Sequence, residues 1–179
     1  MDGSDTTPDQ ALAHGPRHLL VDHLHAVGAL TAQHAGNRGG PWAHLAGLWH
    51  DLGKYRPGFQ AYVRIDADAH IEGKLPRNSD KTHSAAGALH ALKAFEARFG
   101  AQGRKAARIL AYVIAGHHAG LADWIAGLDD RLLGTRAPDS EREYAEALAA
   151  CESANADILP LPAGFDLRQA FEANARCTQ

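Results

Sequence analysis

The sequence predicts an all-α domain with a polar site where several helix ends meet. Apolar residues recur at the three- and four-residue spacing of helices along most of the 179 residues. No segment alternates apolar and polar residues as a half-buried strand would, and glycine or proline separates the apolar segments. With 45% hydrophobic residues and a mean hydropathy of -0.31, the chain is long enough for one ordinary domain with its own core.

The N-terminal third predicts a flexible tail and two helices. We expect residues 1–15 to form the tail and residues 16–179 to form a single domain. Helical spacing predicts a first helix over residues 18–34, which "GNRGGP" then interrupts. A second helix is expected over residues 42–52, with Gly53 as its C-terminal cap. The residues of the first helix expected to face the core are Leu20, His23, Leu24, Val27 and Leu30.

The rest of the chain predicts a short helical stretch and four further helices. A loop over residues 56–80 is expected to contain a short helical stretch at residues 59–63. Ser79, Asp80 and Thr82 are candidate caps for the next helix, which closes at Gly100. The remaining helices are expected over residues 104–121, 137–155 and from 165 to the end. In the first of these, the residues expected to face inward are Ile109, Leu110, Val113 and Ile114.

Composition excludes several classes of protein. The net charge of -3 excludes a strongly basic protein that binds nucleic acid by bulk charge alone, although a local basic patch is still compatible with it. The sequence contains no stretch of about 18 apolar residues, so no transmembrane helix is expected. The segment "MDGSDTTPDQ" lacks a signal-peptide core. The two cysteines, Cys151 and Cys177, show no metal-binding spacing. A reduced, cytoplasmic protein with no membrane partner is therefore expected.

Histidine is the most unusual feature of the composition, with 12 residues in 179. This is roughly three times its ordinary usage, and histidine is the commonest ligand of transition metals. Five histidines and one aspartate are expected at inward positions near helix ends, namely His23, His50, Asp51, His83, His117 and His118. The other seven are expected in the tail, in loops or on the surface, with His18 and His90 nearest the site: His14, His18, His25, His34, His44, His70 and His90.

The adjacent pair His50 and Asp51 lies in an apolar segment, where an ionised carboxylate needs compensation. A carboxylate has two oxygens and can bridge two metal ions about 4 Å apart, while neutral imidazoles complete each shell. Such a donor set favours Mn, Fe, Co, Ni or Zn over Ca, with Mg as a further candidate. Each histidine alone is more often a hydrogen-bonded core residue, so the prediction of two divalent ions rests on the combination.

Four segments of the sequence resemble one family. They are "DHLHAVGALTA", "LAGLWHDLGKYRPGFQAYV", "HSAAGALHA" and "IAGHHAGL", within residues 17–121. They are similar to the HD nuclease domain of the CRISPR-associated helicase-nuclease of type I systems, a member of the HD phosphohydrolase superfamily. "HDLGK" followed by Phe59 and Gln60 is a specific signal, as is "GHHAGL". The resemblance implies an HD-domain helical bundle with metal ions at inward helix ends.

The resemblance also implies roles for the matching residues. Asp51 would bridge two ions and be catalytic, and Lys54 would be a second catalytic residue near the scissile phosphate. One ion would be held by His23, His50 and Asp51, and the other by Asp51, His83, His117 and His118. The candidate substrate-binding residues are Lys54 and Ser84, which match the family, and Arg56 and Lys81, which follow from position alone. Lys74, Arg77 and Lys81 lie in the loop before His83 and could track a strand, although a solvated loop explains these cations equally well.

One part of the family pattern has no match. The family has a late aspartate on a helix resembling "LFSxLVDADxxxT", and residues 165–179 resemble only the segment upstream of it. We therefore expect the sequence to stop before this last ligand and before any helicase domain, and the nuclease activity of this chain alone to be weak. Asp157 and Asp166 are poor substitutes, because they lie in or beside a proline-rich loop.

Three functions are compatible with the sequence. The leading hypothesis is a metal-dependent nuclease that cuts single-stranded DNA in CRISPR interference, with a guide-RNA effector complex and a helicase domain as partners. Trp124 and Tyr55 are candidate platforms for stacked bases, although core packing is the more common role. The alternatives are an HD phosphohydrolase acting on nucleotides or cyclic dinucleotides, and a non-catalytic DNA-binding or adaptor remnant.

Overall fold

The predicted all-α class is confirmed. A computed structural model describes residues 10–14, 18–64, 82–118, 120 and 123–167. Its described residues form helices and connecting turns, with no β-strand beyond one isolated bridge between Leu12 and Leu19. None of the described helices combines the length and the hydrophobicity that a membrane-spanning segment needs.

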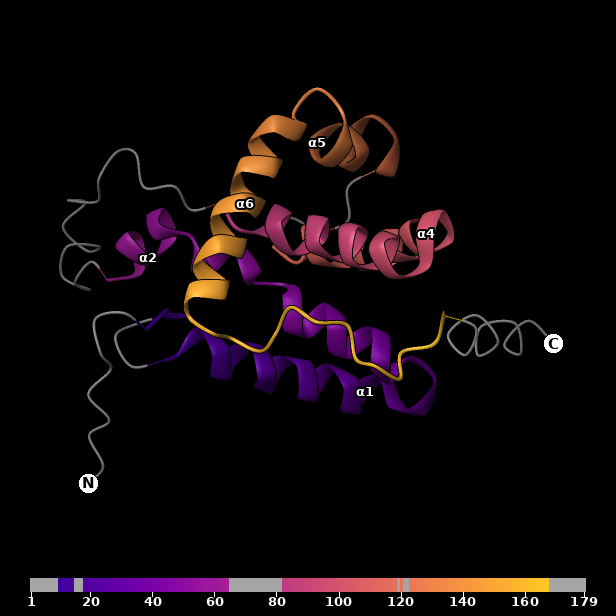
Figure 1. Cartoon of the computed structure of the whole chain (residues 1–179), viewed down its shortest axis with the longest axis horizontal. Helices are drawn as coiled ribbons and strands as arrows, with labels where there is room; N and C mark the ends of the chain where they lie inside the picture. The colour runs from indigo at the N-terminus through magenta and orange to yellow at the C-terminus, as the bar shows by residue number, and fades with distance from the viewer. Residues whose placement is uncertain (1–9, 15–17, 65–81, 119, 121–122, 168–179) are drawn as a thin grey trace.

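Helix α1 (Leu20–Trp49) is a helical hairpin, in which two segments run antiparallel (Figure 1). The segments meet at Gly36, where φ is 63° and ψ is -163°, so the predicted break in "GNRGGP" is confirmed. The Thr31 hydroxyl donates a hydrogen bond to the Ala43 carbonyl at 2.7 Å and ties the two segments together. The start and the end of α1 therefore lie at the same end of the molecule.

Helix α4 (Ser84–Gly116) repeats this arrangement (Figure 1). Its break is at Gly100, where φ is 64° and ψ is -152°, as the sequence predicts. Both hairpins consequently turn at one end of the fold and present their first and last residues at the other. The two hairpins pack against each other through their buried faces.

The remaining elements cover the open end of the hairpins. They are η1 (Leu52–Tyr55), α2 (Pro57–Val63), η2 (Trp124–Leu128), α5 (Asp129–Leu133) and α6 (Ala137–Ser153). Helix α6 lies across α4 and η1 (Figure 1). The sequence did not predict η2 or α5, because "WIAGLDDRLL" is too short to show a helical repeat. The predicted last helix, from residue 165 on, lies mostly outside the described residues.

Three predicted helix details are wrong. Gly53 does not cap the second segment of α1, because that segment ends at Trp49 and Gly53 lies inside η1. Thr82 does not cap α4, whose first amide groups are bound by a side chain from α6; Ser79 and Asp80 lie outside the described residues. Three residues expected to face the core face solvent instead: Leu30 in α1, and Ile109 and Val113 in α4, are 53%, 55% and 48% exposed.

Aromatic residues fill the core between the hairpins. The Phe95 side chain is fully buried and contacts the rings of Trp42, Phe99 and Phe165 at centroid distances of 5.3, 5.9 and 5.2 Å. The Trp49 indole donates a hydrogen bond to the Ile158 carbonyl at 2.7 Å. These contacts hold the segment after α6 against both hairpins.

Residues 10–14, predicted as part of a flexible tail, are packed against the domain. Leu12 and Ala13 are buried, and Leu12 exchanges two hydrogen bonds with the Gln60 side chain, at 2.8 and 2.9 Å. Gln60 also donates to the Lys54 carbonyl at 2.7 Å. The amide of Gln60 thus joins this segment to the turn that follows Asp51.

We expect the substitution Phe95→Ala to lower the free energy of unfolding by about 3–5 kcal/mol, because it removes a fully buried ring between rigid helices. Phe99→Ala is the matched control, since Phe99 is only partly buried, and its cost should be clearly smaller. Chemical denaturation of both variants measures the difference. Equal costs would show that Phe95 is not the centre of the core.

Candidate metal centre

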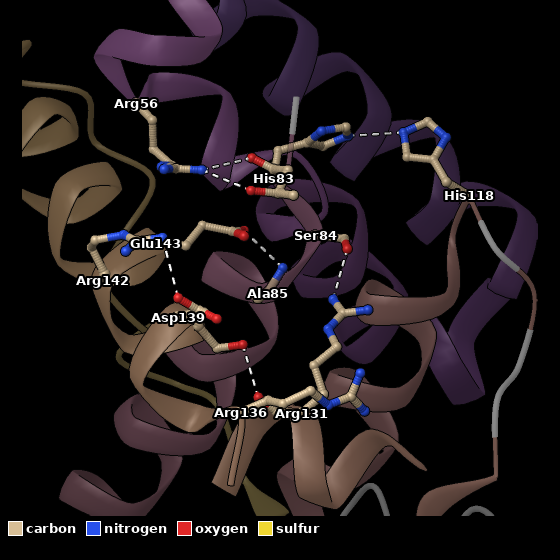
Figure 2. A pocket seen from close by; sticks show the side chains of 12 residues that line it. Arg56, His83, Ser84, Ala85, His118, Arg131, Arg136, Asp139, Arg142 and Glu143 are labelled. Carbon is tan, nitrogen blue, oxygen red and sulfur yellow. Dashed lines mark hydrogen bonds and ion pairs between the residues drawn. The ribbon is translucent and has the colours of Figure 1, made fainter. Parts of the chain in front are cut away.

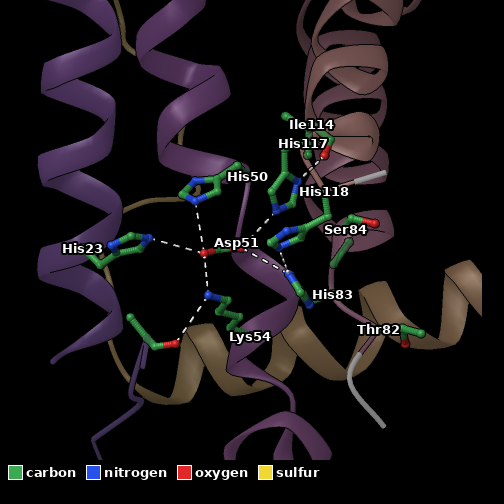
Figure 3. Close-up of polar contacts among 12 residues, drawn as sticks. His23, His50, Asp51, Lys54, Thr82, His83, Ser84, Ile114, His117 and His118 are labelled. Atoms are coloured by element: carbon green, nitrogen blue, oxygen red, sulfur yellow. Dashed lines mark hydrogen bonds and ion pairs between the residues drawn. The ribbon is translucent and has the colours of Figure 1, made fainter. Parts of the chain in front are cut away.

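The open ends of the two hairpins bring the predicted ligands together (Figure 3). His23 lies in the first turn of α1, and His50 and Asp51 follow its last residue. His83 directly precedes α4, and His117 and His118 directly follow it. The fold thus places these six residues around one cluster, as the sequence predicts, although His83 lies before α4 and not within its first turn.

Asp51 is the centre of the cluster. Its side chain is 4% exposed, and its two oxygens face different histidines. Oδ2 lies 3.3 Å from His23 Nε2 and 3.1 Å from His50 Nε2. Oδ1 lies 3.4 Å from His83 Nε2 and 3.3 Å from His117 Nε2. A carboxylate that divides its oxygens in this way has the geometry of a bridging ligand.

Two groups of side chains could hold a metal ion. One group is His23, His50 and Asp51; the other is Asp51, His83, His117 and His118. Within each group, one donor atom from every residue lies within 4.8 Å of the others. In the second group, the Nε2 atoms of His83 and His118 face each other at 2.9 Å. Two imidazole nitrogens that converge in this way can share one proton or bind the same metal ion.

The buried polar atoms of the cluster fit a cation. Asp51 Oδ1 and His117 Nε2 are buried and make no hydrogen bond among the described residues, although they lie 3.3 Å apart. Leaving such atoms unsatisfied costs about 1–3 kcal/mol each, and more for a charged group. Imidazole nitrogen and carboxylate oxygen are ligands that divalent transition metals accept. A metal ion between them would satisfy both atoms.

Backbone carbonyls orient two of the ligands. His50 Nδ1 lies 2.7 Å from the Gly47 carbonyl, and His117 Nδ1 lies 2.6 Å from the Ile114 carbonyl. A carbonyl can only accept, so in a neutral ring the proton sits on Nδ1. Nε2 then carries the free lone pair and points to Asp51. This is the arrangement that fixes the tautomer of metal-binding histidines in proteins.

Burial and neighbouring charges shift the pKa values of the candidate ligands. Burial opposes ionisation of Asp51, but contacts with His117, His50 and Lys54 outweigh it and hold the pKa of the carboxyl well below its usual range. Burial lowers the pKa of His23 and His118. For His117, burial is outweighed by the neighbouring Asp51 carboxylate, so its pKa is raised. Protons therefore compete with a metal most strongly at His117.

Lys54 lies inside the cluster. Its ammonium group is 2.8 Å from Asp51 Oδ2 and 3.4 Å from the Ala13 carbonyl, and the residue is buried. The ammonium therefore balances the carboxylate charge on the side of His23 and His50. A protonated lysine has no lone pair and cannot be a ligand. Its predicted contact with a scissile phosphate stays a prediction.

Close backbone packing positions His83. A Cβ atom on Gly53 would lie 2.2 Å from the His83 carbonyl oxygen, so only glycine lets η1 approach this closely. The Arg56 guanidinium donates to the carbonyl and hydroxyl oxygens of Thr82, at 3.0 and 2.9 Å, and pairs with Glu146. Arg56, predicted to bind substrate, thus has contacts that hold the residue before His83.

A buried carboxylate from α6 caps α4 directly after His83. Glu143 Oε1 accepts hydrogen bonds from the amides of Ala85 and Ala86, at 2.9 and 3.0 Å. Ser84 Oγ accepts a hydrogen bond from Arg131 at 2.8 Å. Sequence reasoning missed Glu143 and Arg131, because neither lies near a motif and their partners are 47 to 58 residues away. Lys81, Lys74 and Arg77 lie outside the described residues.

Two further histidines lie beside the cluster. The His14 ring contacts those of His18 and His23 at centroid distances of 4.7 and 5.0 Å. The sequence placed His18 near the site but His14 in the tail. Their donor atoms are not part of either converging group.

His90 is an exception to the surface prediction. It is buried against Trp49, and its Nε2 lies 2.8 Å from the Leu159 carbonyl, so it is a core residue. His44 is half-buried, whereas His25 and His34 are exposed as predicted; His70 lies outside the described residues.

The other candidates lie elsewhere. Asp157 and Asp166 belong to neither converging group, in agreement with the prediction that they are poor substitutes for the late aspartate. Tyr55 is buried in the core and presents no face to a base. Trp124 is partly buried, with Arg108 over its ring at 5.2 Å to the centroid.

Comparisons with known proteins add no assignment. No protein-family model matches the chain, and no curated protein matches it. The geometry of the described side chains is therefore what supports a function.

We expect Asp51→Ala to remove most bound metal, because both groups of ligands share this carboxylate. Lys54→Ala should keep its metal, since the ammonium is not a ligand. Elemental analysis after dialysis against Mn²⁺ or Zn²⁺ measures the metal content of both variants. Wild-type metal content in Asp51→Ala would refute the bridging role, and thermal denaturation confirms that each variant is folded.

Proposed function

We propose that the chain is a metal-dependent phosphodiesterase that uses two divalent transition-metal ions to cleave single-stranded DNA. The observation that carries this proposal is the division of the Asp51 oxygens between two groups of histidines. The ions expected from these donors are Mn, Fe, Co, Ni or Zn, with Mg as a further candidate.

The reaction class follows from the donors. When bound, a pair of divalent ions lowers the pKa of a water and neutralises charge on a phosphoryl group under in-line attack. Asp51 would hold both ions at a fixed separation, and the carbonyl contacts of His50 and His117 would keep their Nε2 atoms directed inward. Lys54 would release its contact with Asp51 once metal is present and offer its charge to the substrate phosphate.

The substrate and partners are proposed from the sequence. The segments around the ligands resemble the HD nuclease domain of type I CRISPR helicase-nucleases, which favours single-stranded DNA as substrate. From the same resemblance, we propose a guide-RNA effector complex and a helicase domain as partners. The ligand geometry supports metal-assisted hydrolysis of a phosphate ester, a reaction class common to this function and to nucleotide hydrolysis.

The two metal sites should differ in affinity. The group of Asp51, His83, His117 and His118 offers four donors, whereas the group of His23, His50 and Asp51 offers three, and Lys54 competes there as a cation. Isothermal titration with Mn²⁺ at pH 7.5 is expected to show one tight and one weak site. Two equally tight sites would show that a further ligand completes the second group.

Metal affinity should also fall as the pH decreases through the ordinary histidine pKa of about 6.5, because an imidazolium cannot bind a cation. Since the pKa of His117 is raised, the four-donor site should begin to weaken above that pH. Repeating the titration between pH 5.5 and 8 tests whether metal affinity falls as the pH decreases. An affinity that is independent of pH would contradict histidine ligation.

We expect the wild-type chain to cut circular single-stranded DNA slowly and only at a high Mn²⁺ concentration, because one of the two groups offers three donors. Asp51→Ala should lose at least about 100-fold in rate. A second assay with mononucleotides and cyclic dinucleotides is run under the same conditions. Cutting of DNA alone supports the proposal, and turnover of nucleotides alone would replace it with a nucleotide phosphohydrolase. Bound metal without turnover of any substrate would replace it with a non-catalytic binding function.

A further inference from the structure

We propose that a basic pocket beside the metal centre binds the phosphate next to the scissile one along the substrate strand, with Arg131 as its main contact. This inference rests on the proposed nuclease function and specifies how the substrate lies on the site. The pocket has a volume of about 800 Å³ and extends from His83 and His118 toward α5 and α6 (Figure 2).

The pocket is continuous with the metal centre. His83 and His118, two of the ligands that face each other, form one side of it. The other side comes from Arg131 in α5, Arg136 in the turn before α6, and Arg142 in α6. A substrate held at the cluster would therefore have its flanking atoms directed into this space.

The pocket carries an excess of positive charge in a chain whose net charge is -3. Its charged lining residues are Arg56, Arg131, Arg136, Arg142, Asp139 and Glu143. Most of these charges have acidic or backbone partners. Arg56 pairs with Glu146 at 2.9 Å, Arg136 with Asp130 at 3.0 Å, and Arg142 with Asp139 at 3.3 Å. The Glu143 carboxylate is bound by the backbone amides of α4.

Arg131 is the exception among these arginines. Its guanidinium donates to Ser84 Oγ at 2.8 Å, and no carboxylate lies within ion-pair distance of it among the residues that the structure describes. The hydroxyl contact is neutral, so the positive charge is not compensated. An arginine offers five donors in a planar fork that matches phosphate oxygens. One donor is used, and the others are available to an anion.

Ser84 fixes the distance between this cation and the metal centre. It directly follows His83 in the chain, so the guanidinium is anchored to the residue after a candidate ligand (Figure 2). Ser140 Oγ donates to the Arg131 carbonyl at 2.9 Å and anchors its backbone to α6. A fixed cation beside, but outside, the ligand cluster suits a second phosphate, because the metal ions themselves neutralise the scissile one. A substrate with successive phosphates is therefore favoured over one with a single phosphate.

The test compares two substrates and two charge-matched variants. Arg131→Ala removes the proposed contact, and Lys105→Ala removes one positive charge from an exposed position on α4 outside the pocket. Cleavage of a 12-nucleotide oligothymidylate is measured beside hydrolysis of bis(4-nitrophenyl) phosphate, which has no neighbouring phosphate. We expect Arg131→Ala to raise KM for the oligonucleotide about tenfold. We expect the loss in kcat/KM of Arg131→Ala on the small diester to be at least fivefold smaller than its loss on the oligonucleotide.

Salt dependence gives a second readout, since loss of one phosphate contact should reduce the slope of log KM against log salt by about 0.7. Arg131→Lys should recover part of the affinity, because it keeps the charge but not the fork. Equal losses on both substrates would overturn the proposal by placing Arg131 at the metal centre. Equal KM values for Arg131→Ala and Lys105→Ala would also overturn it.

A direct binding measurement separates this inference from the proposed function. If the wild type hydrolyses neither substrate, the nuclease function fails, and fluorescence anisotropy with a labelled oligothymidylate then tests the pocket alone. Weaker binding by Arg131→Ala than by Lys105→Ala supports the pocket, and equal binding refutes it. Tighter Arg131-dependent binding of a cyclic dinucleotide than of the strand would also overturn the proposal of a strand.

Discussion

The buried carboxylate of Asp51 is the interaction on which the arrangement of the centre depends. An ionised group with an exposure of 4% is costly unless cations and donors surround it. Here the compensation comes from Lys54 on one side and from histidines at the ends of both hairpins. Because these contacts come from segments far apart in the sequence, the same charge that makes the site also joins α1, η1 and α4.

The sequence predicts the residues of the cluster because their signals are local. His50 and Asp51 are adjacent and lie in an apolar helix, and the breaks at Gly36 and Gly100 follow from short glycine-containing segments. Errors arise where burial depends on distant partners. His90 is buried only because Trp49 and the Leu159 carbonyl surround it, and Ile109 and Val113 are exposed because no element covers that side of α4 in the described residues.

The residues that support the ligands could not be predicted in the same way. Glu143 caps α4 from another helix, and Arg131 reaches Ser84 from α5, an element with no helical repeat in the sequence. A lone charged residue in a surface helix carries no local sign of such a role. The basic residues predicted to bind substrate show the opposite case, in which a charge is already paired. Lys54 pairs with Asp51, and Arg56 contacts Thr82 and Glu146. Spacing along the chain identifies donors, whereas only the fold shows which charges are compensated.

The hairpin geometry separates the two ends of the molecule. A helical segment such as residues 84–99 spans roughly 24 Å, since each residue adds 1.5 Å, so the bends at Gly36 and Gly100 lie far from Asp51. No donor of either group comes from the bends. These two loops are consequently the natural attachment points for a fluorophore or a fused reporter domain, which would follow the protein without entering the ligand cluster.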